Sequence, residues 1–387
     1  MKPKLLFIIN TLTYGGAERV VSLLLNHLAE KYELHLVIFE NIIKYPIPAS
    51  VQVYCLQESS QAQGIHALLR LPVMAKKLAS YCKSHQIDSC ISFLNRACYI
   101  NAIRKTCWPS AVKTIMCERS HQSSILQYLG GGSKIFAIIS KKLISWSYQK
   151  ADLILTNSEL SRLDLQQNFK ITRPIHVVYN PVHITDILQK ATEPVQDYTY
   201  SGFTFISVGK FRVEKNLQLL LQAFSLLKDL PIQLIIIGGG PLETNLKQQA
   251  GELGIADKVW FGGFKSNPFK YIKNANCFVL SSHTEGFPNV LLEALACGKS
   301  VISTDCKSGP REILAAATDM DTVLEKNIEI AEYGILVPEN NPRLLAFAMQ
   351  KIFQENNLRE QYEEKSIRRA AEFSNEIIIP QFEPYFY

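Results

Sequence analysis

Two glutamates, Glu285 and Glu293, stand in the segment whose residue types are best suited to chemistry, residues 281–298. Pro288 lies between them and favours the first turn of a helix, whose first backbone N–H groups would then face a phosphate. Those N–H groups belong to Asn289, Val290 and Leu291. One carboxylate could hold sugar hydroxyls beside a reacting carbon, while Glu293, about a turn and a half into the helix, takes two vicinal ribose hydroxyls. The alternative is an ordinary exposed helix glutamate at 293.

A cluster of cations follows the predicted strand 203–208. Gly209 precedes Lys210, Arg212 and Lys215 in this segment. At the C-terminal end of a strand, such cations would stabilise a diphosphate whose negative charge grows as a bond to it breaks. A solvated surface loop is the alternative explanation of the same residues.

A pair of glycines, Gly15 and Gly16, stands where the first predicted strand turns into a helix. Glycines at such a turn let backbone N–H groups approach an anion, and the helix N-terminus adds a partial positive charge. Because the full Gly-x-Gly-x-x-Gly pattern is absent, an ordinary tight turn is an equal alternative.

The elements that position these residues alternate along the chain. Short β-branched runs alternate with helical patterns, which predicts an α/β protein with parallel sheets. The alternation stops over 182–202, which has no sustained apolar period and is typical of a linker. We expect two doubly wound, Rossmann-like domains, 1–181 and 203–371, facing each other across a cleft. Strands are expected at 4–9, 34–39, 89–93, 113–116, 152–156, 203–208, 233–237, 258–261, 277–280 and 300–303.

Composition excludes several other classes of protein. The chain has 387 residues, of which 47% are hydrophobic and 20% charged, so it can bury large cores and is too long for one ordinary domain. No apolar run approaches the roughly 18–20 residues that span a bilayer. The opening residues favour a buried strand over a signal peptide, so we expect a cytoplasmic protein. The nine cysteines form no Cys-x-x-Cys pair, which indicates reduced, buried thiols and no metal site.

The charge is unevenly distributed between the two halves. Residues 1–180 carry 21 Lys and Arg against 10 Asp and Glu, whereas residues 181–387 carry 20 against 25. A basic first half suggests an anionic surface, a phosphate or a nucleic acid as its partner. We favour no nucleic acid, because no recognised binding motif accompanies the charge. Uneven solubilising charge is the alternative.

The segment Glu285–Glu293 resembles the Glu-x7-Glu signature of the retaining glycosyltransferases of family four (group 1), which have the GT-B fold. Other elements agree in order and spacing, and together they cover nearly the whole chain. They are Gly15 to Arg19, Val178 to Val182, Gly209 to Asn216, Gly238 to Leu242, and Phe261 to Phe264.

This resemblance implies a role for each matching residue. Glu293 would bind the nucleotide ribose and Glu285 the donor sugar, and Lys215 would neutralise the diphosphate. The implied catalytic residues are Lys215, Lys210, Glu285, Arg119 and His121. The implied donor-binding residues are Gly15, Gly16, Gly209, Arg212, Gly263, Phe264, Gly286, Phe287, Pro288, Asn289, Val290, Leu291 and Glu293. No metal or other cofactor is implied, because lysines and helix dipoles carry the charge a metal would carry.

Two positions depart from the family pattern. Where the family usually has an arginine five residues before the phosphate lysine, this chain has Lys210, for which Arg212 could compensate. Where many members have a histidine that contacts the donor sugar, either Arg119 occupies that place or His121 reaches it. The resemblance also implies that the first domain binds the acceptor, the second the nucleotide sugar, and that a C-terminal helix within 372–387 packs back on the first domain.

Two predicted helices of the basic half could lie on an anionic membrane surface. The first spans 65–84 and the second 133–150. The second combines lysines with many apolar residues, which fits a helix at a bilayer surface. The alternative is that the apolar residues pack on the sheet while the lysines stay solvated. The residues of the second helix concerned are Lys134, Lys141, Lys142, Lys150, Ile135, Phe136, Ile138, Ile139, Leu143, Ile144, Trp146 and Tyr148.

These observations lead us to expect a retaining glycosyltransferase. It would move a sugar from a nucleotide diphosphate donor, by family habit a UDP-sugar, to a growing glycan on a polyprenyl diphosphate at the cytoplasmic membrane face, as in O-antigen, capsule or protein glycosylation. A soluble acceptor is the alternative within the class. A nucleotide-sugar epimerase of the same fold and a non-catalytic binding protein are the alternatives outside it.

Overall fold

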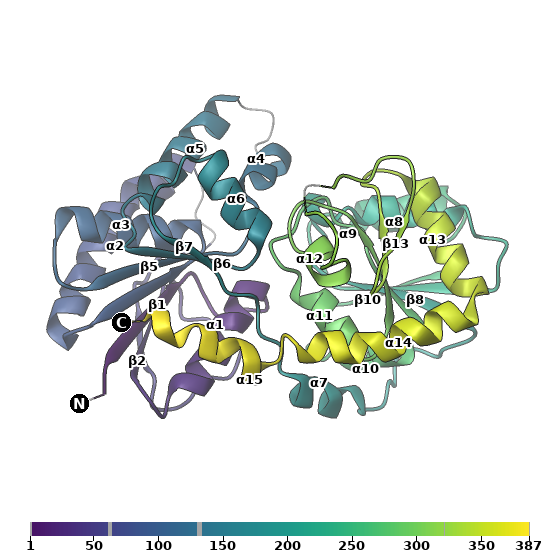
Figure 1. The fold of residues 1–387 in the computed structure, drawn as a ribbon, viewed down its shortest axis with the longest axis horizontal. Helices are drawn as coiled ribbons and strands as arrows, with labels where there is room; N and C mark the ends of the chain where they lie inside the picture. Colours follow the sequence, from purple (N-terminus) through teal and green to yellow (C-terminus); the bar gives the residue numbers. More distant parts are fainter. Residues whose placement is uncertain (1, 61–63, 130–133, 321, 387) are drawn as a thin grey trace. The chain divides into compact units, whose positions relative to one another are not determined.

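The computed structural model describes residues 2–60, 64–129, 134–320 and 322–386. It divides the chain into two compact units (Figure 1). The first unit comprises Met1–Pro181 together with Asn375–Tyr387, and the second comprises Val182–Ser374. Each unit is a parallel sheet with helices on both faces, so the predicted fold class, two Rossmann-like domains, is confirmed.

The first unit is built on a seven-stranded sheet in the order β3-β2-β1-β4-β5-β6-β7. All neighbouring strands in it run parallel. The central strands are buried almost throughout, as expected where helices cover both faces of a sheet. The strands are β1 (Lys4–Ile9), β2 (Glu33–Ile38), β3 (Gln52–Cys55), β4 (Ser89–Phe93), β5 (Lys113–Glu118), β6 (Leu153–Thr156) and β7 (Ile175–Val177).

Helices α2, α3, α5 and α6 cover one face of this sheet. Leu6 and Ile8 of β1 point into the cluster that α2 and α3 complete, and a second cluster joins α3, α5 and α6 to β5 and β6. The helices of the unit are α1 (Gly16–Leu28), α2 (Gly64–His85), α3 (Asn95–Cys107), α4 (Gln122–Leu129), α5 (Lys134–Tyr148) and α6 (Glu159–Gln167).

The other face is covered by α1 and by the C-terminal segment 375–386, drawn in yellow in Figure 1. Phe7 alternates with Leu6 and Ile8 and therefore points to this side of the sheet. Its ring meets the ring of Phe386 edge to face, with 6.2 Å between centroids. Ser89 Oγ donates a 2.6 Å hydrogen bond to the carbonyl oxygen of Phe386. The end of the chain is thus part of the first unit's core.

The second unit repeats the same plan. Its seven-stranded sheet has the order β10-β9-β8-β11-β12-β14-β13, and only the β13–β14 pair is antiparallel. The strands are β8 (Phe203–Val208), β9 (Ile232–Ile237), β10 (Val259–Gly263), β11 (Cys277–Leu280), β12 (Ser300–Thr304), β13 (Glu329–Ile330) and β14 (Ile335–Val337).

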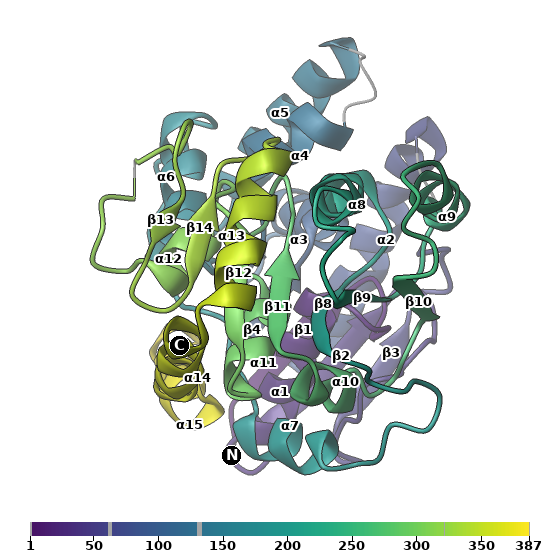
Figure 2. The same ribbon diagram turned by 90° about the vertical axis from the view of Figure 1, so that its right-hand side faces the viewer.

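Helices α8, α9 and α13 cover one face of this sheet, and α7, α10, α11 and α14 the other (Figure 2). A large apolar cluster built from α8, α13 and the sheet strands forms the core of the first of these faces. The helices are α7 (Ile184–Ala191), α8 (Leu217–Ser225), α9 (Glu243–Glu252), α10 (Phe269–Asn274), α11 (Asn289–Ala296), α12 (Pro310–Leu314), α13 (Pro342–Gln354) and α14 (Asn356–Ala371).

The structure differs from the sequence predictions where the chain leaves one unit for the other. Residues 182–202 are not all linker, because α7 occupies 184–191 and packs on α10 and α11. Residues 372–374 stay with the second unit. The expected C-terminal helix is a short helix, α15 (Asn375–Ile378), followed by two 3-10 turns over 379–381 and 383–385. Pro380 and Pro384, at the starts of those turns, cannot continue an α-helix.

Candidate active site

The loop 281–288, called here the Glu285 loop, follows the C-terminal end of β11 and leads into α11. Pro288 caps α11 and Asn289 is its first residue. Glu285 forms an ion pair with Lys215, whose Nζ lies 2.6 Å from the carboxylate, and it accepts a 2.6 Å hydrogen bond from Ser282 Oγ. Its side chain is almost buried, at 9% exposed, whereas that of Lys215 is 25% exposed. The sequence-predicted sugar-binding carboxylate and diphosphate-binding lysine are therefore in direct contact.

Lys215 ends a 3-10 turn that follows β8, and glycines let the residues between β8 and this turn lie close to the end of the next strand. A Cβ on Gly238 would lie 1.8 Å from the carbonyl oxygen of Gly209, so only glycine fits there. Lys210 and Arg212 are both exposed, and Arg212 lies 3.9 Å from the Glu214 carboxylate. Lys215 is thus the cation that the fold fixes, while these two side chains remain at the surface.

Glu293 lies in the second turn of α11 and is 7% exposed. It is therefore no ordinary surface glutamate, which was the alternative considered from the sequence. Burial raises the pKa of the nearby Cys297 thiol to about 12, and the negative charge of the Glu293 carboxylate is the next largest cause of this rise. Such a carboxylate at the edge of a helix can accept hydrogen bonds from a ligand with two hydroxyls.

The backbone at the start of α11 corrects one expectation. The N–H of Leu291 donates a 3.0 Å hydrogen bond to the carbonyl oxygen of Pro288, so it is not available to a phosphate. The physical reason is that the carbonyl of Pro288, the N-cap residue, accepts one of the first backbone hydrogen bonds of the helix. That Asn289 and Val290, together with the partial positive charge of the helix end, face a phosphate stays a prediction.

Residues 307–309, which the sequence did not single out, hold the Glu285 loop in place. Ser308 Oγ donates a 2.6 Å hydrogen bond to the carbonyl oxygen of Gly286. Gly309 has φ +90°, and a Cβ there would lie 2.5 Å from Pro288 and 2.8 Å from the Gly286 oxygen. Thr284 pairs with Lys307 as an isolated parallel bridge. No local pattern marks these residues, because the contacts join positions about twenty residues apart in the sequence.

Gly263 and Phe264 lie at the end of β10, at the same edge of the sheet as the Glu285 loop because the strands are parallel. Gly263 has φ +67°, a conformation that favours glycine. The Phe264 ring is 58% exposed, which leaves a face on which a planar group could stack. The two residues predicted to border the nucleotide base are thus accessible.

In the first unit, Gly15 caps α1 and Gly16 is its first residue. A Cβ on Gly15 would lie 2.3 Å from the Glu18 carboxylate, which turns back against the start of its own helix. A carboxylate at this place stabilises the helix end. An anion that binds here would have to displace it.

Arg119 and His121 follow the end of β5 and have different surroundings. The Arg119 guanidinium lies between the rings of Phe93 and Phe382, 5.3 Å and 5.5 Å from their centroids. It donates to Asn180 Oδ1 at 3.3 Å, while its Nε and Nη2 atoms are buried and have no hydrogen-bond partner among the residues that the structure describes. His121, 7% exposed, has its Nδ1 within 2.9 Å of Ser124 Oγ. That one of these two residues contacts a donor sugar stays a prediction.

Glu118, directly before Arg119, is a buried carboxylate at the centre of a polar network. It accepts hydrogen bonds from Tyr148 Oη and Gln122 Nε2, each at 2.7 Å, and from Ser120 Oγ at 2.8 Å. Burial raises its pKa, and these hydrogen bonds oppose that effect. The network holds the turn that carries Arg119 in one conformation.

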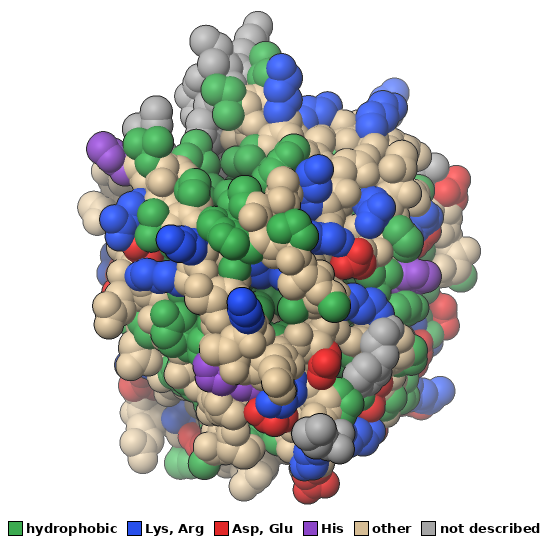
Figure 3. Space-filling model, turned by 90° about the vertical axis from the view of Figure 1, so that its left-hand side faces the viewer, with side chains coloured by type: hydrophobic (Ala, Val, Ile, Leu, Met, Phe, Trp, Pro, Cys, Tyr) green, Lys and Arg blue, Asp and Glu red, His purple; other side chains and the backbone are tan. Residues whose placement is uncertain are grey.

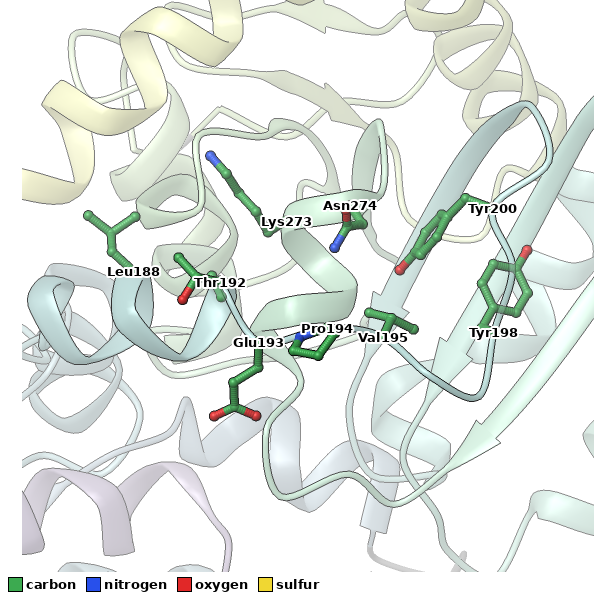
Figure 4. A pocket seen from close by; sticks show the side chains of 10 residues that line it. Leu188, Thr192, Glu193, Pro194, Val195, Tyr198, Tyr200, Lys273 and Asn274 are labelled. Atoms are coloured by element: carbon green, nitrogen blue, oxygen red, sulfur yellow. The ribbon is translucent and has the colours of Figure 1, made fainter.

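A pocket of about 600 Å³ opens elsewhere in the second unit (Figure 4). It is lined by α7, by the segment that follows it with Tyr198 and Tyr200, and by Lys273 and Asn274 at the end of α10. These elements precede β8 and β11, so the pocket lies at the opposite edge of the sheet from the Glu285 loop. None of the predicted site residues lines it.

Among the residues that the structure describes, no three His, Cys, Asp or Glu side chains form a group that could hold a metal ion. Within the same ranges no helix has both the length and the apolar character needed to cross a membrane.

Comparisons with known proteins place the chain in a family. The model "Glycosyl transferases group 1" matches residues 200–369, and "Glycosyltransferase Family 4" matches residues 14–186. The chain is 35% identical to the N-acetylgalactosamine-N,N'-diacetylbacillosaminyl-diphospho-undecaprenol 4-alpha-N-acetylgalactosaminyltransferase of Campylobacter jejuni, over 96% of this chain and 95% of the relative. It is 30% identical to an uncharacterized glycosyltransferase of Methanocaldococcus jannaschii, over 65% of this chain and 66% of that protein.

Solved structures agree on the fold. HepE of Anabaena, in complex with UDP, superposes with a TM-score of 0.73 at 18% identity, covering 100% of this chain and 99% of HepE. Sucrose-phosphate synthase of Thermosynechococcus elongatus has a TM-score of 0.79 at 17% identity, with 100% and 98% covered. Since the Campylobacter relative also matches almost end to end, this chain belongs to the group 1, family four glycosyltransferases of the GT-B fold.

Proposed function

We propose that this glycosyltransferase moves a sugar from a nucleotide diphosphate donor to a hydroxyl of a lipid-linked oligosaccharide, with retention of anomeric configuration. The observation that carries the proposal is the contact of Lys215 with Glu285 beside the start of α11, which also holds Glu293. A cation, a helix end and two carboxylates are the groups that a diphosphate sugar requires.

Each of these groups has a separate task in the proposed reaction. Glu293 accepts hydrogen bonds from the two ribose hydroxyls, and Glu285 from hydroxyls of the sugar. Lys215 and the backbone from Phe287 onward face the diphosphate. Because an ammonium group has three N–H bonds, Lys215 can keep its bond to Glu285 while it binds a phosphate oxygen.

The bond that breaks joins the anomeric carbon to an oxygen of the diphosphate. The acceptor oxygen forms its bond to the same carbon on the same face, and its proton passes to the departing diphosphate. Negative charge therefore grows on the diphosphate, where Lys215 and the α11 helix end stabilise it. The proposal includes no metal or other cofactor, since these groups carry that charge. Lys210 and Arg212 add further positive charge from the surface.

Similarity to known proteins supports our proposals for the donor and the acceptor. HepE of Anabaena was solved with UDP, and we propose a UDP-sugar here, with the base beside Gly263 and Phe264. The Campylobacter relative is named for transfer of N-acetylgalactosamine to a diphospho-undecaprenol-linked sugar. We accordingly propose a polyprenyl-diphosphate-linked glycan as acceptor, bound by the first unit, with Gly16 and either Arg119 or His121 near the donor sugar.

We further propose that the first unit lies on the anionic inner face of the cell membrane. Helices α2 and α5 both pack on α3 and expose apolar side chains together with lysines. Figure 3, which looks onto this unit, shows hydrophobic side chains in its upper part with Lys and Arg around them. The exposed residues are Leu68, Leu69, Val73 and Lys76 of α2, and Ile138, Ile139, Lys141, Lys142 and Trp146 of α5. Ser133 and the side chains of Lys134, Ile135 and Phe136, predicted for the same surface, lie outside the described residues.

Calorimetric titration with UDP, GDP and ADP, beside a Glu293→Ala variant, tests the donor site. We expect one nucleotide to bind selectively and its affinity to fall in the variant. Transfer from radiolabelled UDP-sugars to extracted lipid-linked oligosaccharides then identifies the acceptor. Transfer to soluble oligosaccharides alone would favour a soluble acceptor, and interconversion of the nucleotide sugar without transfer would favour an epimerase. Failure of all three nucleotides to bind would refute the donor assignment.

A further inference from the structure

The chain passes between its two units twice, after Pro181 and after Ser374. On the side of the second unit, the residues next to these two points are bonded to each other. The N–H of Val182 donates a 2.8 Å hydrogen bond to the carbonyl oxygen of Phe373. Val182 and Ser374 also pair as an isolated parallel bridge. The two crossing segments are therefore joined to each other and to Phe373 by backbone contacts.

The Phe373 side chain connects these crossing segments to the Glu285 loop. Its ring, 4% exposed, meets the Phe287 ring edge to face, with 5.2 Å between centroids and 62° between planes. The Arg369 guanidinium lies 4.8 Å from the centroid of the Phe373 ring. Arg369 is itself fixed, since it donates to the carbonyl oxygens of Ile313 at 2.9 Å and Glu312 at 2.7 Å.

Phe287 is therefore held from two directions. Its own ring is buried against Phe373, whereas the backbone on either side of it is held by Ser308 and Gly309. The backbone is held by one hydrogen bond and by close packing within the second unit. The ring contact, within the same unit, joins the loop to the segment where the chain leaves that unit.

We propose that Phe373 is a positioning residue of the transfer reaction, which sets the conformation of the Glu285 loop through Phe287 and links it to both crossing segments. This inference rests on the proposed function, in which the backbone from Phe287 onward binds the donor diphosphate. Phe373 does not touch the substrate. Its ring fixes the loop so that the first N–H groups of α11 and Glu285 stand in the geometry that the diphosphate and sugar require.

The proposal makes a specific prediction about ligands that differ by one phosphate. The loop meets the terminal phosphate, whereas Glu293 meets the ribose. A Phe373→Leu variant should lose affinity for the nucleoside diphosphate by about threefold to tenfold, the range that corresponds to loss of one edge-to-face aromatic pair. Its affinity for the nucleoside monophosphate should stay within about twofold, so the advantage of the diphosphate shrinks.

The matched control is Phe353→Leu. Phe353 makes a similar edge-to-face pair with Phe203, 5.3 Å between centroids, on α13 and away from the Glu285 loop. Both variants lose one aromatic ring from the second unit, so both should be destabilised, but only Phe373→Leu should change the ratio of diphosphate to monophosphate affinity. Phe287→Leu should reproduce the change, and the double variant Phe287→Leu, Phe373→Leu should add little to it.

Calorimetric titration of the full-length protein with UDP and UMP measures these ratios, and thermal unfolding confirms that each variant is folded. A folded Phe373→Leu variant with the wild-type ratio would overturn this inference while leaving the donor site intact. An equal change in Phe353→Leu would also overturn it, because the effect would then be one of general stability. Failure of UDP, GDP and ADP alike to bind to the wild-type protein would instead refute the proposed function, and this inference with it.

Discussion

Replacing Lys215 by methionine tests the central contact of the site through two independent quantities. The substitution keeps most of the aliphatic side chain but leaves the Glu285 carboxylate, 9% exposed, with the Ser282 hydroxyl as its hydrogen-bond donor in the part of the chain that the structure describes. A buried polar group left without a partner costs about 1–3 kcal/mol, and a buried charge costs more. Because Lys215 is 25% exposed, water can reach the site, and we expect a loss of about 1–3 kcal/mol. Urea unfolding measures this loss.

The effect on catalysis should be larger and should not follow stability. Removal of one group that stabilises developing negative charge costs about 10²–10³ in kcat, or roughly 2.7–4 kcal/mol. Adding Glu285→Gln to Lys215→Met removes both charges, so the free energy of unfolding should return to within about 1 kcal/mol of the wild type. Sugar transfer should remain lost. Recovery of activity in the double variant, or a double variant as unstable as Lys215→Met, would refute the reasoning.

Three further predictions concern other parts of the chain. Gly309→Ala should lower transfer and destabilise the protein more than Gly254→Ala, measured by urea unfolding, because a Cβ at Gly309 collides with Pro288 whereas one at Gly254 (φ +67°) has nothing within 4 Å. Burial raises the pKa of Glu118, so ionisation of this carboxyl group opposes folding. The stability of the wild type relative to Glu118→Gln should therefore fall as the pH rises through the range just above the ordinary glutamate pKa. Unfolding at a series of pH values measures this difference. Ile139→Glu should weaken sedimentation with anionic vesicles, whereas Phe347→Glu, at an exposed apolar position of the second unit, should not.

Much of the fold is predictable because buried parallel strands have a strong sequence pattern. The strands predicted at 4–9 and 203–208 have the same bounds in the structure. The strands that were missed are all short. Three of them lie at sheet edges, namely Gln52–Cys55, Ile175–Val177 and Glu329–Ile330, and the fourth, Ile335–Val337, is buried inside its sheet but has only three residues. Helix α7 was missed because eight residues contain too few apolar repeats to reveal a helical period.

The site was predictable by residue type but not by contact. Local spacing indicated that Glu285 and Lys215 are candidate site residues. It could not indicate the ion pair between them, because that pair joins positions 70 residues apart. The supports of the loop, Ser308 and Phe373, are an ordinary serine and an ordinary phenylalanine in the sequence. Their importance arises only from the tertiary fold, which brings them to Gly286 and Phe287.

The packing of Phe382 and Phe386 in the first unit has a consequence for the order in which the protein folds during its synthesis. Domains generally fold from the N-terminus as they leave the ribosome. Here one face of the first sheet lacks the Phe386 ring that meets Phe7, and the Phe382 ring that meets Arg119, until the whole second unit has been translated. The second unit, which is made of one continuous segment, can therefore complete its core before the first one does.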